Sequence, residues 1–378
     1  MKIGIIGCGN ISGIYIQNAF KMHNLELIAL ADLDLERAKN KVAEIRQKAG
    51  EWKLPAATHW PVACSVKELL SNPEIELVIN LTIPKAHAQV AIATLEAGKH
   101  TYGEKPIGVN REEARHILQV AKAKGLRVGS APDTFLGAGL QTCRKIIDDG
   151  LIGQPVGATA FMTCPGHESW HPDPAFYYQK GGGPMLDMGP YYLTALVNLL
   201  GSVKTVAGIN RITHPERTIT SAPKKGTKIK VETPTHIAST LQFADGAIGT
   251  MLMSFDVQRA DLPHIQIFGT LGTLAVPDPN NFGGTIRLWQ SGKEKPEWTQ
   301  MPLAFANAGN SRGLGVADMA KAIATHRPHR ASGELAYHVL DVMQATLEAS
   351  DSGRHITIES QPARPAPLPV GLQDGEID

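Results

Sequence analysis

Residues 2–12 read KIGIIGCGNIS, and this stretch decides the fold of the first part of the chain. The apolar run ending in Gly7 predicts a buried parallel strand, and residues 11–22 predict a helix. In the intervening turn, Gly7 permits a tight bend, Gly9 lets the backbone approach a pyrophosphate, and Ser12 keeps the helix close to the sheet. The helix start attracts phosphate through its free N–H groups. The residues expected to contact a dinucleotide here are Gly7, Gly9, Asn10 and Ile11.

Asp32 provides a second sign of a dinucleotide site. It ends the predicted strand 25–32 and lies about 20 residues after the glycine turn, where the ribose-binding acid of such folds belongs. A carboxylate there accepts hydrogen bonds from the ribose hydroxyls and repels a 2′-phosphate. The residues that follow directly are Leu33 and Asp34, with no arginine among them. The sequence therefore predicts NAD rather than NADP as the cofactor.

The chain divides into two regions that differ in the order of their predicted strands and helices. Strands alternate with helices up to about residue 131, which predicts a doubly wound parallel sheet of the Rossmann type. After residue 150 strands follow one another directly, which predicts an α+β domain with a large, open, mostly antiparallel sheet. The stretch 50–61 is expected to be a loop. The expected divisions are a dinucleotide-binding domain (1–132), a substrate-binding and oligomerisation domain (133–360), and a Pro-rich arm (361–378), either loose or packed on a neighbouring subunit.

Composition excludes several classes of function. The 378 residues carry a formal net charge of +1 and no basic stripe, which argues against nucleic acid and anionic membranes as partners. No apolar run approaches a membrane span, and the N-terminus enters a strand directly instead of reading as a signal peptide. The four scattered cysteines form no CxxC pair, so we expect reduced thiols in a cytoplasmic protein, without disulfides or a metal site.

Three stretches of the chain, the first of which includes the glycine turn, resemble the sequence pattern of one known family. They are GCGNISGIY at 7–15, NLTIPKAHAQVAIATLEAGKHTYGEKP at 80–106, and GGGPMLDMGPYYLTALVNLLG at 181–201. In this order they resemble the Gfo/Idh/MocA family of nicotinamide-dependent sugar and polyol oxidoreductases. The resemblance implies a carbohydrate substrate, with Lys105 at the reacting hydroxyl and Asp187 facing the substrate. It also implies that four residues lie near the nicotinamide and its ribose: Thr82, Pro84, His87 and Glu104.

The sequence departs from the family pattern at Tyr191, which stands where the family commonly has an acid/base histidine. A tyrosine beside the Lys105 cation would have a lowered pKa, so the pair is one candidate for proton exchange. The other candidate is the loop 166–174, from which His171 or His167 can enter the site. These histidines can equally be ordinary loop residues.

Several other residues are candidates for substrate contact. Aromatic rings pack on the apolar faces of sugars, and a cluster of six between Trp170 and Tyr192 offers such rings, although at least half are expected to fill the core. Asp133 follows the last Rossmann strand and is a candidate to line the same crevice. Arg312 is either a site residue or a surface ion-pair residue.

Three functions remain open at this stage. The first is an NAD-dependent dehydrogenase of a sugar, sugar derivative or cyclic polyol. The second is an NAD-dependent glycoside hydrolase, which oxidises C3 transiently, eliminates the aglycone, adds water and returns the hydride. The third is a non-catalytic NAD sensor, which the pairing of Lys105 with Asp187 disfavours. In each case a homodimer or homotetramer is expected.

Overall fold

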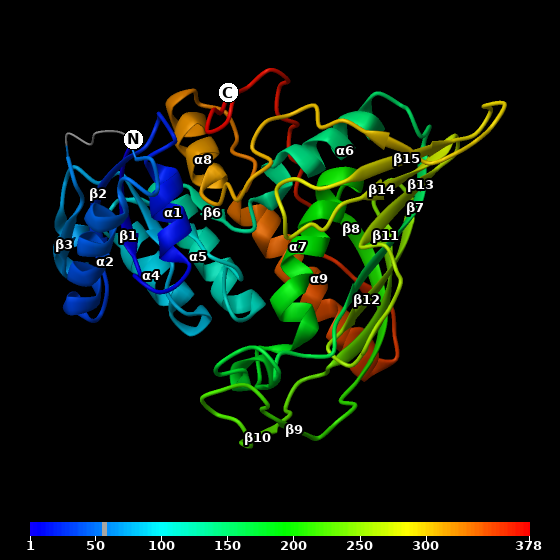
Figure 1. Ribbon diagram of the computed structural model, residues 1–378, viewed down its shortest axis with the longest axis horizontal. Helices are drawn as coiled ribbons and strands as arrows, with labels where there is room; N and C mark the ends of the chain where they lie inside the picture. Colours follow the sequence, from blue (N-terminus) through cyan, green and yellow to red (C-terminus); the bar gives the residue numbers. More distant parts are fainter. Residues whose placement is uncertain (55–58) are drawn as a thin grey trace.

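The N-terminal region forms a six-stranded parallel sheet in the order β3-β2-β1-β4-β5-β6. We describe residues 1–54 and 59–378 of a computed structural model (Figure 1). The strands are β1 (Lys2–Ile6), β2 (Glu26–Ala31), β3 (Val62–Cys64), β4 (Leu77–Asn80), β5 (His100–Gly103) and β6 (Val128–Ser130). The sheet reverses its order between β1 and β4, where Ile6 lies opposite Asn80. Ligands of such sheets bind at this switch point, outside the carboxyl ends of the strands.

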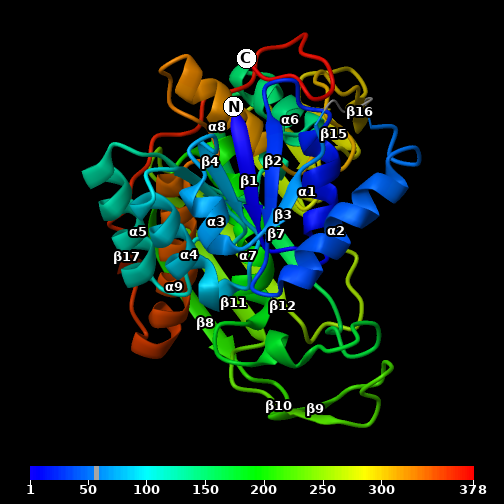
Figure 2. The same ribbon diagram turned by 90° about the vertical axis from the view of Figure 1, so that its left-hand side faces the viewer.

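Helices cover both faces of this sheet, as Figure 2 shows. They are α1 (Ser12–Ala19), α2 (Leu35–Lys48), α3 (Val66–Ser71), α4 (Pro84–Glu96) and α5 (Arg111–Lys124). The starts of α2 and α5 are capped by Asp34 and Asn110, whose side chains accept from backbone N–H groups. The short elements β3 and α3 were not expected from the sequence. Of the stretch 50–61 expected to be a loop, residues 55–58 lie outside the described residues.

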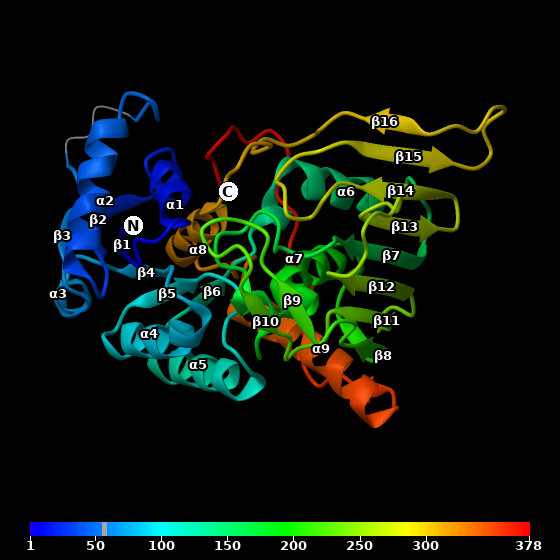
Figure 3. The ribbon, with the colours of Figure 1, turned by 60° about the horizontal axis from the view of Figure 1, so that its bottom comes forward.

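A second sheet of nine strands follows, in the order β16-β15-β14-β13-β7-β12-β11-β8-β17 (Figure 3). Its strands are β7 (Pro155–Thr163), β8 (Val203–Arg211), β11 (His236–Phe243), β12 (Ile248–Ser254), β13 (Ile265–Gly269), β14 (Gly272–Val276), β15 (Ile286–Gln290), β16 (Thr299–Met301) and β17 (Ile356–Thr357). Neighbouring strands are antiparallel except for β7 and β12. Residues alternate between buried and exposed along β11, so one face packs inward and the other stays open. The expected fold class is confirmed.

A helical layer lies between the two sheets (Figure 1). It contains η1 (Thr134–Leu136), α6 (Ala138–Asp148), α7 (Gly183–Leu200), α8 (Leu314–Ala324) and α9 (Gly333–Ser352). Helix α7 was not among the elements expected from the sequence, and it contains Pro190 at an internal position. It is nevertheless buried along most of its length, so packing outweighs the cost of the proline.

Two smaller elements extend from the second domain. The 3₁₀ turn η2 (Ala175–Tyr178) precedes α7, and a hairpin of β9 (Glu216–Thr218) and β10 (Lys228–Lys230) lies beside that turn (Figure 3). The backbone N–H of Glu232 donates to the carbonyl of Tyr178 at 2.7 Å, which joins the hairpin to the turn.

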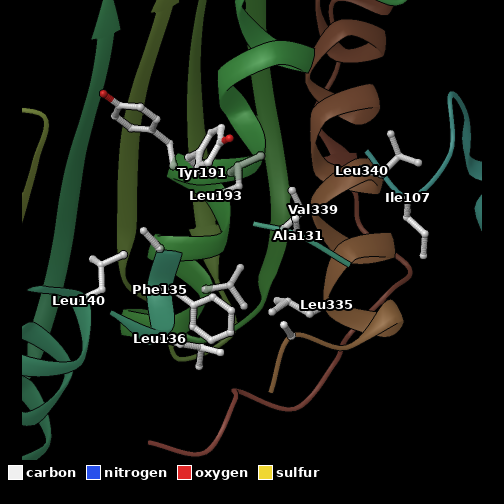
Figure 4. Close-up of a cluster of buried hydrophobic side chains, with 14 of the residues drawn as sticks. Ile107, Ala131, Phe135, Leu136, Leu140, Tyr191, Leu193, Leu335, Val339 and Leu340 are labelled. Atoms are coloured by element: carbon white, nitrogen blue, oxygen red, sulfur yellow. The ribbon is translucent and has the colours of Figure 1, made fainter. Parts of the chain in front are cut away.

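Side chains from both domains share one hydrophobic core. Figure 4 shows Ile107 and Ala131 from the Rossmann side near Val339 of α9, with Phe135 of η1 and Tyr191 of α7 in the same cluster. All of these side chains are at most 9% exposed. This packing fixes α7 against the carboxyl edge of the parallel sheet.

The C-terminal arm is not loose, because its backbone is hydrogen-bonded to its own chain. Its packing on a neighbouring subunit stays a prediction. The Arg144 guanidinium donates to the Pro365 carbonyl at 2.8 Å, and Arg330 donates to Ala366 at 2.9 Å. Because proline has no backbone N–H, it cannot donate to neighbouring carbonyls of the arm. The buried arginines donate to these carbonyls and so bind the extended arm. Among the described residues, no helix is long and apolar enough to cross a membrane.

Candidate active site

The turn after β1 forms an open cradle of backbone. Gly7 has φ of +104°, and a Cβ there would lie 2.6 Å from the Leu81 carbonyl carbon, so only glycine fits. A Cβ on Gly9 would meet nothing within 4 Å, and Gly9, Asn10 and Ile11 are all exposed. Helix α1 starts here with no side-chain cap, so its N–H groups face outward. These features fit a dinucleotide pyrophosphate held by Gly9, Asn10 and Ile11.

Asp32 lies at the end of β2 beside this cradle. Its carboxylate accepts from the backbone N–H of Cys8 at 2.8 Å and of Asp34 at 3.1 Å, which fixes its orientation. The Arg37 guanidinium, on the first turn of α2, lies 3.8 Å from the same carboxylate. The sequence pattern did not reveal this arginine, because it returns to Asp32 only once α2 has turned. Asp32 therefore fits the role of the ribose-binding acid, and the exposed guanidinium of Arg37 lies beside it.

The loops after β4 and β5 are tied together by His87. Its Nδ1 lies 2.7 Å from the Pro106 carbonyl and its Nε2 lies 3.0 Å from the Thr82 carbonyl. Since the ring is 3% exposed and both nitrogens face backbone acceptors, His87 braces the loops instead of reaching a ligand. Its position in the loop beside the nicotinamide and its ribose stays a prediction. Thr82 remains half-buried, and Pro84 is exposed at the start of α4.

Glu104 directs the neighbouring lysine. One carboxylate oxygen accepts from the Tyr15 hydroxyl at 2.8 Å, and the other accepts from the backbone N–H of Lys105 at 3.0 Å. Tyr15 is 1% exposed and belongs to α1, so this contact links the glycine turn to the end of β5. Glu104 thereby fixes the backbone from which the Lys105 side chain extends.

Lys105 and Asp187 form the ion pair at the centre of the site. The Lys105 ammonium donates to Asp187 Oδ1 at 3.0 Å and to the Asp187 carbonyl at 2.7 Å. Burial, the largest single influence, would lower the pKa of Lys105, but the charge and hydrogen bond of Asp187 together with Tyr191 and Glu104 hold that pKa above the ordinary value. Burial would likewise raise the pKa of Asp187, and the Lys105 charge holds it below the usual range. Both groups are therefore charged at neutral pH.

Tyr191 lies one helical turn after Asp187 and faces the same side of α7. The Lys105 ammonium lies 5.3 Å from the centre of its ring. The expected lowering of the tyrosine pKa is wrong in its net sign. Burial raises the pKa of Tyr191, and the Lys105 charge offsets this only in part. Tyr191 is thus a neutral hydroxyl at physiological pH.

The two histidines of the loop 166–174 occupy different positions. His167 points at the ion pair, with its Nε2 at 3.8 Å from Asp187 Oδ2. His171 lies further along, where its Nδ1 accepts from the Asp173 backbone N–H at 3.0 Å. Trp170 contacts both imidazole rings edge-on and is 61% exposed. The structure therefore brings His167, rather than His171, to Asp187.

Comparison with known proteins identifies the family to which the chain belongs. The model of the NAD-binding Rossmann fold of the GFO/IDH/MocA oxidoreductases matches residues 1–131, and the model of the GFO/IDH/MocA C-terminal domain matches residues 140–275. The chain belongs to the Gfo/Idh/MocA family of oxidoreductases. Its first domain is accordingly the NAD-binding domain of a Gfo/Idh/MocA enzyme.

Individual relatives of this Gfo/Idh/MocA protein are distant but span most of its length. The 1,5-anhydro-D-fructose reductase of Ensifer adhaerens is 24% identical over 94% of this chain and 98% of its own. The myo-inositol 2-dehydrogenase of Thermotoga maritima is 23% identical over 72% of this chain and 74% of its own. A solved levoglucosan dehydrogenase in complex with NADH superposes with a TM-score of 0.77 at 19% identity, covering 95% and 99% of the two chains. The similarity to this solved structure shows that the two proteins share a fold.

Two candidate substrate residues have structural tasks instead. Asp133 is 1% exposed, and its Oδ2 accepts from the backbone N–H groups of Gly313 and Gly315 at 2.8 and 2.9 Å. It anchors the start of α8 and does not line the crevice. Tyr192 is 1% exposed, and its hydroxyl lies 3.0 Å from His264 Nδ1. Consecutive residues of a helix point about 100° apart, so Tyr191 faces the ion pair while Tyr192 faces the second sheet.

The remaining candidates are consistent with a carbohydrate site. Arg312 is held by the side chains of Asn310 and Asn280 at 2.9 and 3.0 Å, which rules out a mere surface ion pair. No group of three or more metal-ligating side chains suited to a metal ion occurs within residues 1–54 and 59–378. The sequence offered both His171 and His167 from this loop, and the structure places His167 beside Asp187.

Proposed function

We propose that this protein is an NAD-dependent dehydrogenase of a sugar, sugar derivative or cyclic polyol. The observation that carries the proposal is the Lys105–Asp187 pair, which lies at the carboxyl edge of the Rossmann sheet next to the glycine turn. The curated relatives named above, an inositol dehydrogenase and an anhydrofructose reductase, act on compounds of this class. NAD, when bound, supplies the hydride acceptor.

The side chains of the site divide the remaining work. The Lys105 ammonium has a third N–H that can donate to the oxygen of the reacting hydroxyl and stabilise negative charge as it develops there. Asp187 holds that ammonium in place and can accept from a sugar hydroxyl. Tyr191 and Arg312 add donors on the opposite side of the lysine, and the exposed Trp170 ring offers an apolar surface to a sugar face. Such a set binds hydroxyl-rich rings.

An activity screen tests this function directly. The purified protein, incubated with NAD and a panel of cyclic polyols, aldoses and anhydrosugars, is expected to form NADH stoichiometrically with product, measured by absorbance. NADP should be the poorer cofactor, because the Asp32 carboxylate repels a 2′-phosphate. The same panel includes aryl glycosides with catalytic NAD. Aglycone release without NADH accumulation would contradict net dehydrogenation and select a redox-neutral glycosidase.

We further propose that the enzyme is a homo-oligomer joined through the open face of its large sheet. Ile209, Val156 and Ile248 project from three strands of that sheet and are 77%, 53% and 57% exposed. Exposed apolar side chains on an open sheet face favour an interface. Their places on β7, β8 and β12 of the open face support a second copy of the same chain as the partner.

Light scattering after size exclusion checks the oligomer. The wild type is expected at twice or four times the 40.6 kDa of one chain. The substitution Ile209→Glu places a charge on the face and should shift the species toward monomer at micromolar concentration, with an unchanged circular dichroism spectrum. A wild-type protein that elutes as a monomer would contradict the proposal.

A further inference from the structure

His167 holds a position that the ion pair does not explain. Its Nε2 lies 3.8 Å from Asp187 Oδ2, whereas Lys105 occupies the other carboxylate oxygen, Oδ1. One aspartate thus lies between an ammonium and an imidazole. The Nε2 atom is buried and has no hydrogen-bond partner in the described part of the chain. A buried ring nitrogen without a partner is costly in a purely structural residue, so it is available to a ligand at the Asp187 edge.

The imidazole is held rigidly in this orientation. Its ring centre lies 4.0 Å from that of Tyr177 and 4.5 Å from that of Phe255, so aromatic surfaces limit its rotation. The next residue, Glu168, accepts through its carboxylate from Arg217 at 2.7 Å and through its carbonyl from the backbone N–H of Ser221 at 2.9 Å. The β9–β10 hairpin therefore anchors the loop that presents His167.

Asp187 is the acidic group nearest to the imidazole of His167. Titratable groups from four other parts of the chain surround the imidazole. The acidic ones are Asp187 on α7 and Glu168 in the same loop, and the basic ones are Lys105 after β5 and Arg217 on β9. Two phenols, Tyr177 and Tyr178, come from η2. Glu168 is paired with Arg217, and burial raises the pKa of Tyr177 to about 12, so it stays neutral. The Cys164 thiol at the end of β7 also stays neutral, because burial raises its pKa.

We propose that His167 is the acid/base that exchanges the proton of the reacting substrate hydroxyl. This inference rests on the proposed dehydrogenase function and specifies its proton path. Lys105 remains an ammonium and Tyr191 a neutral phenol, so neither offers a free base at neutral pH. An imidazole can both accept and donate a proton, so His167 does offer one. His167 thereby takes the role that the family usually gives to a histidine at the Tyr191 position.

The proton and the hydride leave the substrate in one balanced step. The substrate O–H bond breaks and its proton forms an N–H bond on His167 Nε2. The hydrogen on the same carbon leaves with both electrons of its C–H bond, as hydride, to the nicotinamide. The carbonyl product, NADH and an imidazolium result. Asp187 Oδ2 is close enough to stabilise that imidazolium after a small shift of the ring, and Lys105 stabilises the oxygen during the transfer.

Kinetics of His167→Gln test the proposal. We expect kcat for substrate oxidation to fall about 10²- to 10³-fold, with KM and NAD affinity little changed, because general base catalysis is worth this much. In the wild type, kcat/KM should decline as pH drops through the imidazole pKa, and the variant should lack this acidic limb. Imidazole added to His167→Ala should restore part of the rate. The control His116→Gln, exposed on α5, should behave as wild type.

Two results would overturn the assignment. One is a His167→Gln enzyme with wild-type rate and pH profile; the other is a Tyr191→Phe enzyme that loses the acidic limb while His167→Gln keeps it. A readout independent of turnover is NMR of histidine-labelled protein, in which the signal missing from His167→Gln identifies this residue. Its pKa should fall by about one unit in Asp187→Asn. An unmoved pKa would refute the pairing even if the substrate screen failed, whereas a failed screen alone would count against the dehydrogenase.

Discussion

Replacing Lys105 with alanine is expected to abolish measurable turnover while NAD binding survives. The ammonium is the charged donor nearest the reacting hydroxyl in our proposal, and loss of one such preorganised donor costs about 10²- to 10³-fold in kcat. Removing it also leaves the buried Asp187 carboxylate without its partner, so orientation of the substrate is lost as well. We expect a combined loss of about 10³-fold or more.

Cofactor titration and thermal melting separate this effect from misfolding. NAD binding, followed by nucleotide or protein fluorescence, should be close to wild type, because the glycine turn and Asp32 are untouched. The control Lys39→Ala removes an exposed lysine of α2, whose only recorded ion pair is with Glu36, and should leave both activity and stability unchanged. An unaffected rate in Lys105→Ala would refute the role of this residue.

The pair Gly7→Ala and Gly9→Ala should separate folding from cofactor binding. At Gly7 the added methyl would lie 2.6 Å from the Leu81 carbonyl carbon, on a backbone with φ of +104°. We expect a loss of unfolding free energy of about 3 kcal/mol, together with loss of NAD binding, because the β1–α1 turn must move. At Gly9 the methyl meets no protein atom within 4 Å. That variant should fold normally yet bind NAD at least tenfold more weakly, since the methyl projects where the pyrophosphate approaches.

Denaturant unfolding and NAD titration of both variants check the expectation. The informative result is the contrast, because each glycine serves as the control for the other. A Gly9→Ala protein that binds NAD like the wild type would show that the pyrophosphate does not use this face of the turn. A Gly7→Ala protein of unchanged stability would contradict the close approach of Leu81.

Sequence reasoning performed best where the signal is local. The strand–turn–helix at residues 2–19 follows from hydrophobic period and glycine spacing, and the parallel order follows from strand–helix alternation. It missed α7, a helix that contains Pro190 and is buried along most of its length. Had that helix been recognised, the four-residue spacing of Asp187 and Tyr191 would have placed both on one face.

The sequence by itself determined the Rossmann domain and the glycine turn at Gly7 and Gly9, and the family motifs led us to expect Lys105 and Asp187 in one site. Only the tertiary structure decided which polar residues are free to meet a ligand. Asp133 and His87 are of the right type and near the right place, but nearby backbone groups engage them. Buried polar atoms must find partners, and which atom finds one depends on contacts between segments far apart in the chain. His167 differs because its Nε2 finds no such partner among the described residues and faces Asp187.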